Sequence, residues 1–308
     1  MNEIVAVGDC GVDLYAKVPR LAGYDEKVPG DFVGIFGGGV ASNFACAAAR
    51  LGTPTGLISV VGDDEFGRRA VGSVRDLGVD TGGVVTKPEA PTHFCFVCLD
   101  ERGEKALTIV RTENFSPRWP DLPLAFLDGA RLVHIAPFDL EMASRLAAHC
   151  ASRGIRVSVD LEPGSVGGDL DRVRPLLRNA AILLPNEQCI ETLFGNLPVE
   201  EAARELLELG AEVVVVTRGE QGSFVLTRHD EARVPAFTVP VKDTTGAGDC
   251  FNAAFVSRYL AGQPPVECAE FASAAAALSI GAFGAREGLP STDEVHGFLR
   301  NRGKEAAG

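Results

Sequence analysis

The most informative part of the chain is residues 242–255, which read Lys-Asp-Thr-Thr-Gly-Ala-Gly-Asp-Cys-Phe-Asn-Ala-Ala-Phe. Gly246 and Gly248 allow the backbone to turn tightly and to approach a ligand without obstruction by a Cβ atom. The following residues predict a helix, whose first amides would be unpaired and would favour a bound phosphate. Asp249 could then accept a proton from a hydroxyl that attacks this phosphate. The pattern is equally typical of an aspartate in the first turn of an ordinary helix.

Outside this motif, short apolar runs alternate with helical patterns. Strands are expected at 4–7, 57–61, 132–135, 156–159, 181–184 and 213–217, with a further pair at 223–226 and 232–241. Helices are expected at 43–51, from 67 to about 78, near 140–153, 170–178, 187–194 and 199–209, and then at 247–261 and 265–281. This alternation is typical of βαβ units on a mostly parallel sheet, so the predicted fold class is α/β.

Two segments interrupt the alternation and predict a small β appendage. Residues 13–36 are rich in glycine, proline and charge, and residues 92–99 and 106–110 flank Asp100-Glu-Arg-Gly103, which favours a hairpin turn. A chain of 308 residues with 46% apolar residues can bury one large core, but it is short for two large domains. We therefore expect an α/β core from residues 1–12, 37–91 and 113–308, with the appendage formed by 13–36 and 92–112.

The charge and the cysteine content exclude several classes of partner. The net charge of −13 argues against nucleic acid, which needs a basic face, although a local basic pocket for a phosphorylated substrate is compatible with it. No apolar stretch reaches the roughly 18 residues of a membrane span, and the chain opens on an expected strand instead of a signal peptide. The 8 scattered cysteines are best explained as reduced thiols, which predicts a cytoplasmic protein without membrane partners.

A second glycine-rich stretch covers residues 37–39 and precedes the expected helix that contains Asn43. The glycines permit close backbone approach to a ligand, and the Asn43 amide offers a donor and an acceptor to a pair of hydroxyls. Asp13, soon after the first strand, could accept two hydroxyl protons at once. Asn43 is equally typical of a helix-start cap, so two interpretations of it stand at this point.

The two glycine-rich motifs together resemble the signatures of the ribokinase (PfkB-type) family of carbohydrate and nucleoside kinases. Residues 243–252, Asp-Thr-Thr-Gly-Ala-Gly-Asp-Cys-Phe-Asn, resemble the family's C-terminal signature. Residues 38–52, Gly-Gly-Val-Ala-Ser-Asn-Phe-Ala-Cys-Ala-Ala-Ala-Arg-Leu-Gly, resemble its N-terminal one, and weaker matches lie in the expected order at 62–67, 92–110, 184–187 and 217–222. The resemblance covers nearly the whole chain and implies a three-layer α/β/α core with a small β-sheet lid.

The resemblance also implies an ATP-dependent transfer of phosphate to a hydroxyl, with Mg²⁺ bound to the nucleotide. Asp249 would be the catalytic base, and the lid would close over the substrate and exclude water. The backbone amides at the developing charge would come from Gly246, Ala247 and Gly248. The acceptor hydroxyls would be held by Asp13, Gly38, Gly39 and Asn43.

The nucleotide would lie at a different set of matching positions. Its site would be lined by Asn186, Thr217, Gly219 and Gly222, with the adenine near the alanine-rich helix that starts around Glu267. Asp243 and Thr245 match positions that bind an activating monovalent cation, such as K⁺, in many members of the family. Carbonyl groups from residues 282–288 would complete that cation site.

Two residues depart from the family pattern. Many members carry Asn-x-x-Glu, whose glutamate helps to position magnesium through water, but here Cys189 takes the glutamate position and Glu187 follows the asparagine directly. Neighbouring helix positions point about 100° apart, so Glu187 could replace the glutamate only if the backbone were shifted. Gly11 stands where many members have an asparagine, which leaves Asp13 as the main anchor and indicates an altered acceptor.

Four further positions have an ordinary interpretation beside a functional one. Arg111 follows the second lid strand and would suit a carboxylate or phosphate on the substrate, but a solvated strand-end cation is expected more often. His93 falls in the predicted lid, where it could contact the substrate, but a surface histidine is the favoured interpretation. Asp160 and Glu162 end a strand on the side where α/β sheets bind ligands, and they could equally cap the following turn.

The favoured hypothesis is therefore an ATP-dependent kinase that phosphorylates a hydroxyl, a primary one, of a sugar or sugar-like molecule. A nucleoside kinase is the nearest alternative, because the resembled family includes both. A ribokinase-like sensor without catalysis is the alternative from another class, and Cys189 is the residue that favours it. The lid is expected to expose one β face, so a homodimer that shares lid strands is a further expectation.

Overall fold

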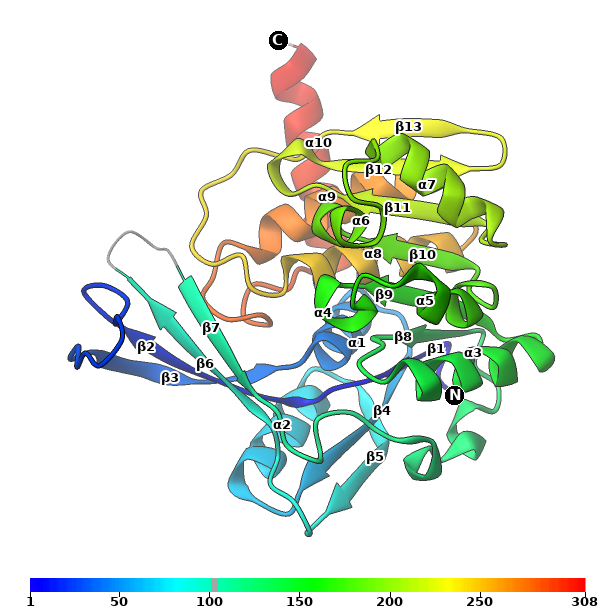
Figure 1. The fold of residues 1–308 in the computed structure, drawn as a ribbon. Helices are drawn as coiled ribbons and strands as arrows, with labels where there is room; N and C mark the ends of the chain where they lie inside the picture. Colours follow the sequence, from blue (N-terminus) through cyan, green and yellow to red (C-terminus); the bar gives the residue numbers. More distant parts are fainter. Residues whose placement is uncertain (101–104, 308) are drawn as a thin grey trace.

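A nine-stranded sheet forms the centre of the computed structural model, which describes residues 1–100 and 105–307 (Figure 1). The strand order is β13-β12-β11-β10-β9-β8-β1-β4-β5, and the strands from β11 to β5 are parallel, whereas β12 and β13 are antiparallel additions. The strand bounds are β1 Ile4–Val7, β4 Thr55–Gly62, β5 Asp80–Lys87, β8 Leu132–Ile135, β9 Arg156–Leu161, β10 Ile182–Pro185, β11 Val213–Thr217, β12 Ser223–Thr227 and β13 Glu231–Val234.

Helices cover both faces of this sheet, because its strands are apolar on both sides. In β1, Ile4 and Ala6 belong to one buried cluster, while Val5 and Val7 belong to the other. The first cluster packs beneath α1 Val40–Arg50, α2 Glu65–Asp76, α8 Ala247–Leu260, α9 Pro265–Ser279 and α10 Thr292–Ala307. The second packs beneath α3 Leu140–Ser152, α4 Pro163–Val166, α5 Leu170–Leu177, α6 Glu187–Phe194 and α7 Val199–Glu208. The expected three-layer α/β/α core is confirmed.

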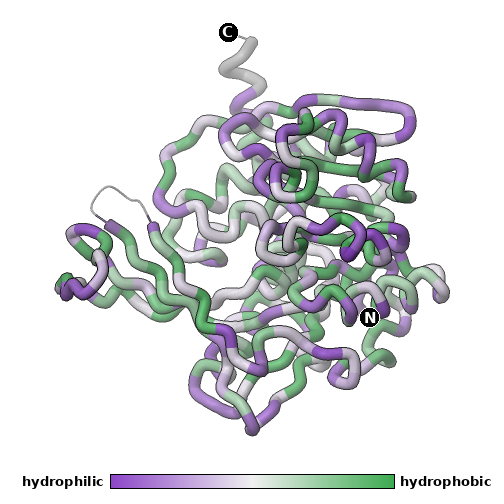
Figure 2. Tube along the Cα trace, viewed as in Figure 1, coloured by the Kyte–Doolittle hydropathy of each residue, from purple (hydrophilic) through white to green (hydrophobic). Residues whose placement is uncertain are grey.

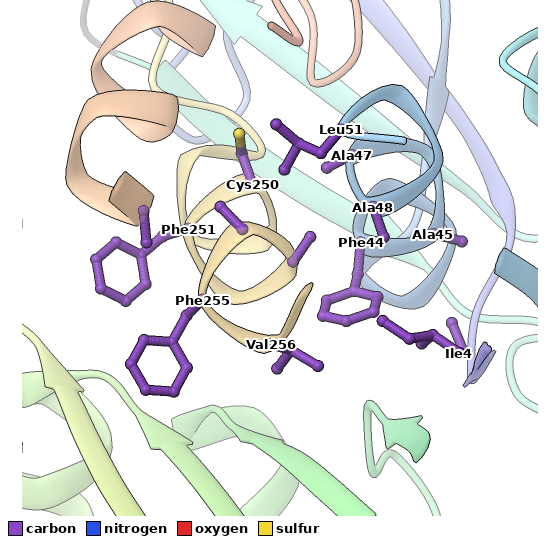
Figure 3. Packing of buried hydrophobic residues seen from close by; sticks show 14 of the residues in the cluster. Ile4, Phe44, Ala45, Ala47, Ala48, Leu51, Cys250, Phe251, Phe255 and Val256 are labelled. Carbon is purple, nitrogen blue, oxygen red and sulfur yellow. The ribbon is translucent and has the colours of Figure 1, made fainter. Parts of the chain in front are cut away.

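Small residues allow α1 and α8 to pack closely side by side (Figure 3). Ala45, Ala47 and Ala48 are buried on α1, and Phe44 of the same helix fills the space above β1. Figure 2 shows the whole chain coloured by hydropathy, with many hydrophobic stretches in the interior of the core and hydrophilic stretches in the surface loops. This packing matters for function because it brings the first turns of α1 and α8 together.

A second, four-stranded sheet projects from the core and is drawn in blue and cyan in Figure 1. Its order is β3-β2-β6-β7, with β2 paired antiparallel to β3, β6 antiparallel to β7, and β2 parallel to β6. The bounds are β2 Gly11–Lys17, β3 Asp31–Gly38, β6 Phe94–Leu99 and β7 Lys105–Val110. The expected hairpin turn at 100–103 lies, apart from Asp100, outside the described residues.

The carboxyl ends of the parallel strands meet at one edge of the large sheet, which is where α/β proteins bind ligands. Asp9 follows β1, Glu162 follows β9, Asn186 follows β10 and Thr217 ends β11. The small sheet projects from the same edge (Figure 1). Lys105 of its strand β7 donates a hydrogen bond to Thr245, which stands just before α8. No helix among the described residues is long and apolar enough to cross a membrane.

Candidate active site

Asp249 lies in the first turn of α8 and is hydrogen-bonded to Asn43 of α1. The Asn43 Nδ2 atom donates to Asp249 Oδ2 over 2.8 Å, and the Asn43 Oδ1 atom accepts from Arg286 Nε over 2.9 Å. Because the guanidinium can only donate, it orients the amide of Asn43 so that the NH₂ group points at the carboxylate. The two residues from the two distant motifs are therefore in direct contact, and Asn43 is not the cap of its own helix, whose N-cap is Gly39.

Burial raises the pKa of Asp249 well above its ordinary value. The hydrogen bond from Asn43 and the charge of Arg286 oppose this rise, whereas the negative charges of Glu162 and Asp9 add to it. The side chain nevertheless keeps partial contact with solvent at the strand-end edge of the sheet. A carboxylate with these properties has a higher proton affinity than a surface aspartate, as a general base for a hydroxyl requires.

The backbone before Asp249 presents amide groups toward the same place. The N–H groups of Gly248 and Asp249 form no hydrogen bond within residues 1–100 and 105–307, as is usual for the first turn of a helix. The Ala247 N–H is occupied, because it donates to the Thr244 carbonyl over 3.3 Å. A Cβ atom at Gly248 would meet nothing within 4 Å, so the space beside the Gly248 Cα atom is open. That space and the positive end of α8 suit an anion.

Asp13 of β2, the expected anchor of the acceptor, is packed closely against Gly38. Burial raises the pKa of Asp13 to about 6, although the nearby Arg286 lowers it. A Cβ atom at Gly38 would lie 2.4 Å from Asp13 Oδ1, so only glycine at this position leaves room for the carboxylate. Gly39 has a positive φ of 105°, which favours glycine on conformational grounds as well.

His93 is buried, and the interpretation of it as a surface histidine is wrong. Its relative exposure is 4%, and its Nε2 atom lies 4.0 Å from Asp9 Oδ2. A Cβ atom at Gly11 would come within 2.5 Å of the same Nε2 atom. The imidazole therefore lies against the position where a side chain would start in relatives that carry an asparagine there. Burial lowers the pKa of His93 despite the charge of Asp9, so the ring is neutral at pH 7.

Arg111 is solvent-exposed, as the ordinary interpretation expects, but it lies near this group. Its guanidinium is 4.9 Å from the centre of the Phe115 ring, and Phe115 packs edge-on against His93 at 4.9 Å between ring centres. Arg111 is thus one aromatic ring away from the buried part of the acceptor side. A cation in this position is available to the outer end of a ligand.

Arg286 is the main residue that sequence reasoning missed. It is only 5% exposed, and no carboxylate of the described residues lies within ion-pair distance of its guanidinium. Its hydrogen bonds go to Asn43, Ser73, Ser42 and the Gly38 carbonyl. The arginine stands in a segment that was expected to supply only backbone carbonyls, and no recognisable sequence pattern marks it.

The carboxylates of Asp160 and Glu162 are near enough to Cys189 for their charges to act on its thiol, and Cys189 stands where the resembled family carries a glutamate. Burial raises the pKa of both carboxyl groups, and each is affected further by neighbouring carboxylates. Burial, Asp160 and Glu162 together raise the pKa of the Cys189 thiol to about 12. Two hard oxygen donors are thus found in the electrostatic vicinity of Cys189, although no group of three or more His, Cys, Asp or Glu side chains among the described residues is arranged as a metal site. They fit Mg²⁺, which is bound in kinases by one or two carboxylates together with phosphates and water.

The predicted nucleotide residues gather at the ends of β10 and β11. The Asn186 side chain caps α6 by accepting from Cys189 N over 2.7 Å, and Asn186 forms a parallel bridge with Thr217. Gly219 and Gly222 have positive φ angles of 53° and 85° in a tight turn after β11. Glu187 is bound to Arg218, with distances of 2.8 Å and 2.6 Å to Oε1, and is therefore engaged elsewhere than at the position of the absent glutamate.

Asp243 and Thr245, the predicted cation ligands, contact a residue of the small sheet. Lys105 Nζ lies 2.8 Å from Thr245 Oγ1 and 3.3 Å from Asp243 Oδ1. Burial raises the pKa of Asp243, but hydrogen bonds from Thr245 and Gly284 outweigh this effect and lower the pKa overall. Within residues 282–288, the N–H group of Gly284 donates to Asp243 Oδ2 over 3.0 Å.

An aspartate in the first turn of a helix, free backbone amides and a second carboxylate nearby are features that a phosphotransferase site on an α/β core requires. A family model described as pfkB family carbohydrate kinase matches residues 1–292 of the chain. The chain belongs to this family, and its activity is the ATP-dependent phosphorylation of a sugar.

The similar proteins act on different sugars. A ribokinase of Bacillus subtilis is 31% identical over 97% of this chain and 100% of its own length. A 2-dehydro-3-deoxygluconokinase of Thermoproteus tenax is also 31% identical, over 97% of this chain and 95% of its own length. Among solved structures, an Arabidopsis thaliana ribokinase complexed with ribose and ATP has a TM-score of 0.84 and 28% identity, and the match covers 97% of this chain and 99% of that one.

Proposed function

We propose that this kinase transfers the terminal phosphoryl group of MgATP to a primary hydroxyl group of a sugar or sugar-like acceptor. In this proposal Asp249 is the general base. The observation that carries the proposal is the contact of Asp249 with Asn43, next to unpaired amides and an open space above Gly248. Names of relatives such as ribokinase and 2-dehydro-3-deoxygluconokinase support a sugar or sugar-acid acceptor.

In the proposed reaction, Asp13, Asn43 and the backbone of Gly38 and Gly39 hold the acceptor hydroxyls. Asp249 takes the proton from the attacking oxygen while a bond forms between that oxygen and phosphorus. The bond to the bridging oxygen of ATP breaks, and ADP leaves with the electron pair. The amides of Gly246 and Gly248 stabilise the charge on the transferred group, and Ala247 joins them if its contact with Thr244 opens.

Mg²⁺ supplies charge neutralisation to the phosphates when ATP is bound. We assign its protein contacts, direct or through water, to Asp160 and Glu162, because both carboxylates lie beside Cys189. The nucleotide contacts would come from the turn at Gly219 and Gly222 and from Asn186 and Thr217. In this proposal Glu187 acts only as the partner of Arg218.

The small sheet would serve as the lid of the site. Residues 13–36 and 92–112 would form this lid, and residues 1–12, 37–91 and 113–308 would form the core. Asp13 and Cys95 lie on the inner face of this sheet, which supports its role as a lid.

The outer face of the small sheet supports a homodimer, since Phe32 and Phe96 are 70% and 47% exposed there. All 8 cysteines are free thiols, which supports a location in the reducing cytoplasm.

The direct test is phosphate transfer from MgATP across a panel of sugars, sugar acids and nucleosides, with Asp249→Asn as the variant. Asparagine keeps the shape and can still accept the Asn43 hydrogen bond, so acceptor affinity by calorimetry should stay within a few-fold. Loss of the base should lower kcat by about 10²–10⁴-fold. Wild-type protein that binds sugars but phosphorylates no member of the panel would favour the sensor, and phosphorylation of nucleosides alone would favour a nucleoside kinase.

A further inference from the structure

The buried carboxylate of Asp243 is the centre of a hydrogen-bond cluster that joins three parts of the molecule. Its side chain has 0% exposure, whereas that of Lys105 has 25%. Oδ1 accepts from the backbone N and the hydroxyl of Thr245, at 2.9 Å and 2.7 Å. Oδ2 lies 3.0 Å from the Tyr15 hydroxyl and 3.0 Å from Gly284 N. The small sheet contributes two of these partners, Tyr15 and Lys105.

A monovalent metal ion at this position does not fit the residues that are present. Such an ion needs several oxygen atoms with free lone pairs. Here the oxygens of Asp243 and Thr245 are already directed at an ammonium group, a phenol hydroxyl and two backbone N–H groups. A bound K⁺ and the Lys105 ammonium would also repel each other at such short range.

We propose that Lys105 is a tethered cation that takes the place of the activating monovalent ion at Asp243 and Thr245. It is a positioning residue: its charge neutralises a carboxylate that stands only three positions before Gly246, the residue that begins the turn into α8. The proposal rests on the function proposed above, in which the amides of this turn stabilise the transferred phosphoryl group. The enzyme therefore needs no added K⁺.

The contact of Lys105 with Asp243 also links the position of the small sheet to the turn at Gly246 that leads into α8. Lys105 begins β7, and the segment that leads from β13 into α8 lies beside this end of the strand (Figure 1). When the ammonium leaves, Asp243 keeps its neutral donors but loses its only cationic partner among the described residues. A fully buried carboxylate without a counter-charge is costly in free energy. The charge of Asp243 beside the turn into α8 is therefore neutralised only when β7 holds Lys105 against it.

The test compares wild type, Lys105→Ala, Lys105→Met and Lys17→Ala in KCl, NH₄Cl and tetramethylammonium chloride at equal ionic strength. Wild type and Lys17→Ala, which loses an exposed lysine of the same sheet, should show the same kcat in all three salts within about twofold. Lys105→Ala should lose about ten- to hundredfold in kcat in tetramethylammonium chloride, as expected for a lost charged hydrogen bond. K⁺ or NH₄⁺ should restore much of this loss, because either ion fits the vacated space. Lys105→Met fills that space and should not be rescued.

Thermal unfolding gives a readout that does not depend on activity. K⁺ should raise the Tm of Lys105→Ala relative to tetramethylammonium, and should leave the Tm of wild type unchanged. Marked activation or stabilisation of wild type by K⁺ would overturn the proposal. A Lys105→Ala protein that gains neither activity nor Tm from K⁺ would also overturn it. If wild type phosphorylates nothing, the proposed function fails, but the Tm comparison still decides the role of Lys105.

Discussion

Arg286 sets the electrostatic balance of the site at the scale of single residues. Its guanidinium orients Asn43 through Nε, and its charge lowers the pKa of both Asp13 and Asp249 against the effect of burial. Since the described residues place no carboxylate in contact with it, its positive charge is not neutralised by an ion pair.

Replacement of Arg286 should therefore change the pH dependence of the reaction. Asp249 must be ionised to accept a proton, so kcat/KM should rise with pH through its raised pKa. Arg286→Gln removes a charge that lowers this pKa, so the acid limb should move to higher pH, and Arg286→Lys should move it less. The measurement is kcat/KM from pH 5 to 9 with folding checked by circular dichroism. An unchanged acid limb in a folded Gln variant contradicts this role.

The contact between Gly11 and His93 predicts that Gly11→Ala lowers the folding stability, and that an added His93→Ala restores only part of it. A Cβ atom at Gly11 would lie 2.5 Å from His93 Nε2 and 2.7 Å from the His93 carbonyl. Gly11→Ala should destabilise the fold by about 1–3 kcal/mol, as overpacking does, and should raise the acceptor KM. Adding His93→Ala should recover only the part due to the imidazole, because the backbone overlap persists. Urea unfolding of the two single variants and the double variant measures this coupling. Additive effects would show that the ring does not fill the space beside Gly11.

At the scale of elements, the start of α8 offers a matched pair of glycines with different functions. Gly246 has a φ of 78°, and a Cβ atom there would lie 2.7 Å from the Ala285 Cβ. Gly248 lies one residue inside the helix, and a Cβ atom there would meet only open space. Gly246 is thus needed for the turn itself, whereas the glycine at 248 matters only if a ligand occupies the space above it.

The two alanine variants should separate accordingly. Gly246→Ala should lower the free energy of unfolding by about 1–3 kcal/mol and reduce kcat, because the turn is strained and displaced. Gly248→Ala should leave stability unchanged or raise it by up to about 1 kcal/mol, since alanine favours the helix. Its kcat/KM for ATP should nevertheless fall, because the methyl group obstructs the phosphate. Full activity of Gly248→Ala would contradict a phosphate at this position.

At the scale of the whole molecule, the small sheet has two faces with different surroundings. Strand alternation places Tyr15 and Val97 on the inner face, where both are fully buried, and Phe96 on the outer face, where it is half exposed. The inner face is explained by the active site and by the contacts with Asp243. The end of the outer face that lies next to the core packs against α2, where Phe66 contacts Phe94, whereas Phe32 and Phe96 of the same face are exposed.

We expect this outer face to form the homodimer proposed above. Wild type should elute as a dimer in size-exclusion chromatography with light scattering at micromolar concentration. Phe96→Glu with Phe32→Lys should shift it to a monomer, because charged side chains on an apolar contact are costly to bury. Tyr24→Glu replaces an even more exposed aromatic residue, in the loop between β2 and β3, and serves as the control. A wild-type monomer at these concentrations would rule out the lid-mediated dimer.

Regular elements of the core could largely be predicted because they depend on local pattern. The strands 4–7, 132–135 and 213–217 and the helix 187–194 have the predicted bounds, since each is a short apolar run or amphipathic stretch with clear end signals. β5 and α10 were missed. β5 is a partly exposed edge strand with two glycines, and α10 is a polar C-terminal helix, so neither carries a strong apolar period.

The sequence alone determined the α/β class and the two glycine-rich motifs, because alternation and residue type along the chain carry that information, and it indicated Asp249 as the candidate base through the resemblance of both motifs to the family's signatures. Only the tertiary structure placed Arg286 against Asn43, His93 against Gly11, Asp160 and Glu162 beside Cys189, and Lys105 on Asp243. These contacts join residues far apart in the sequence. Their energies depend on burial and on distances of a few ångströms, which sequence spacing does not specify.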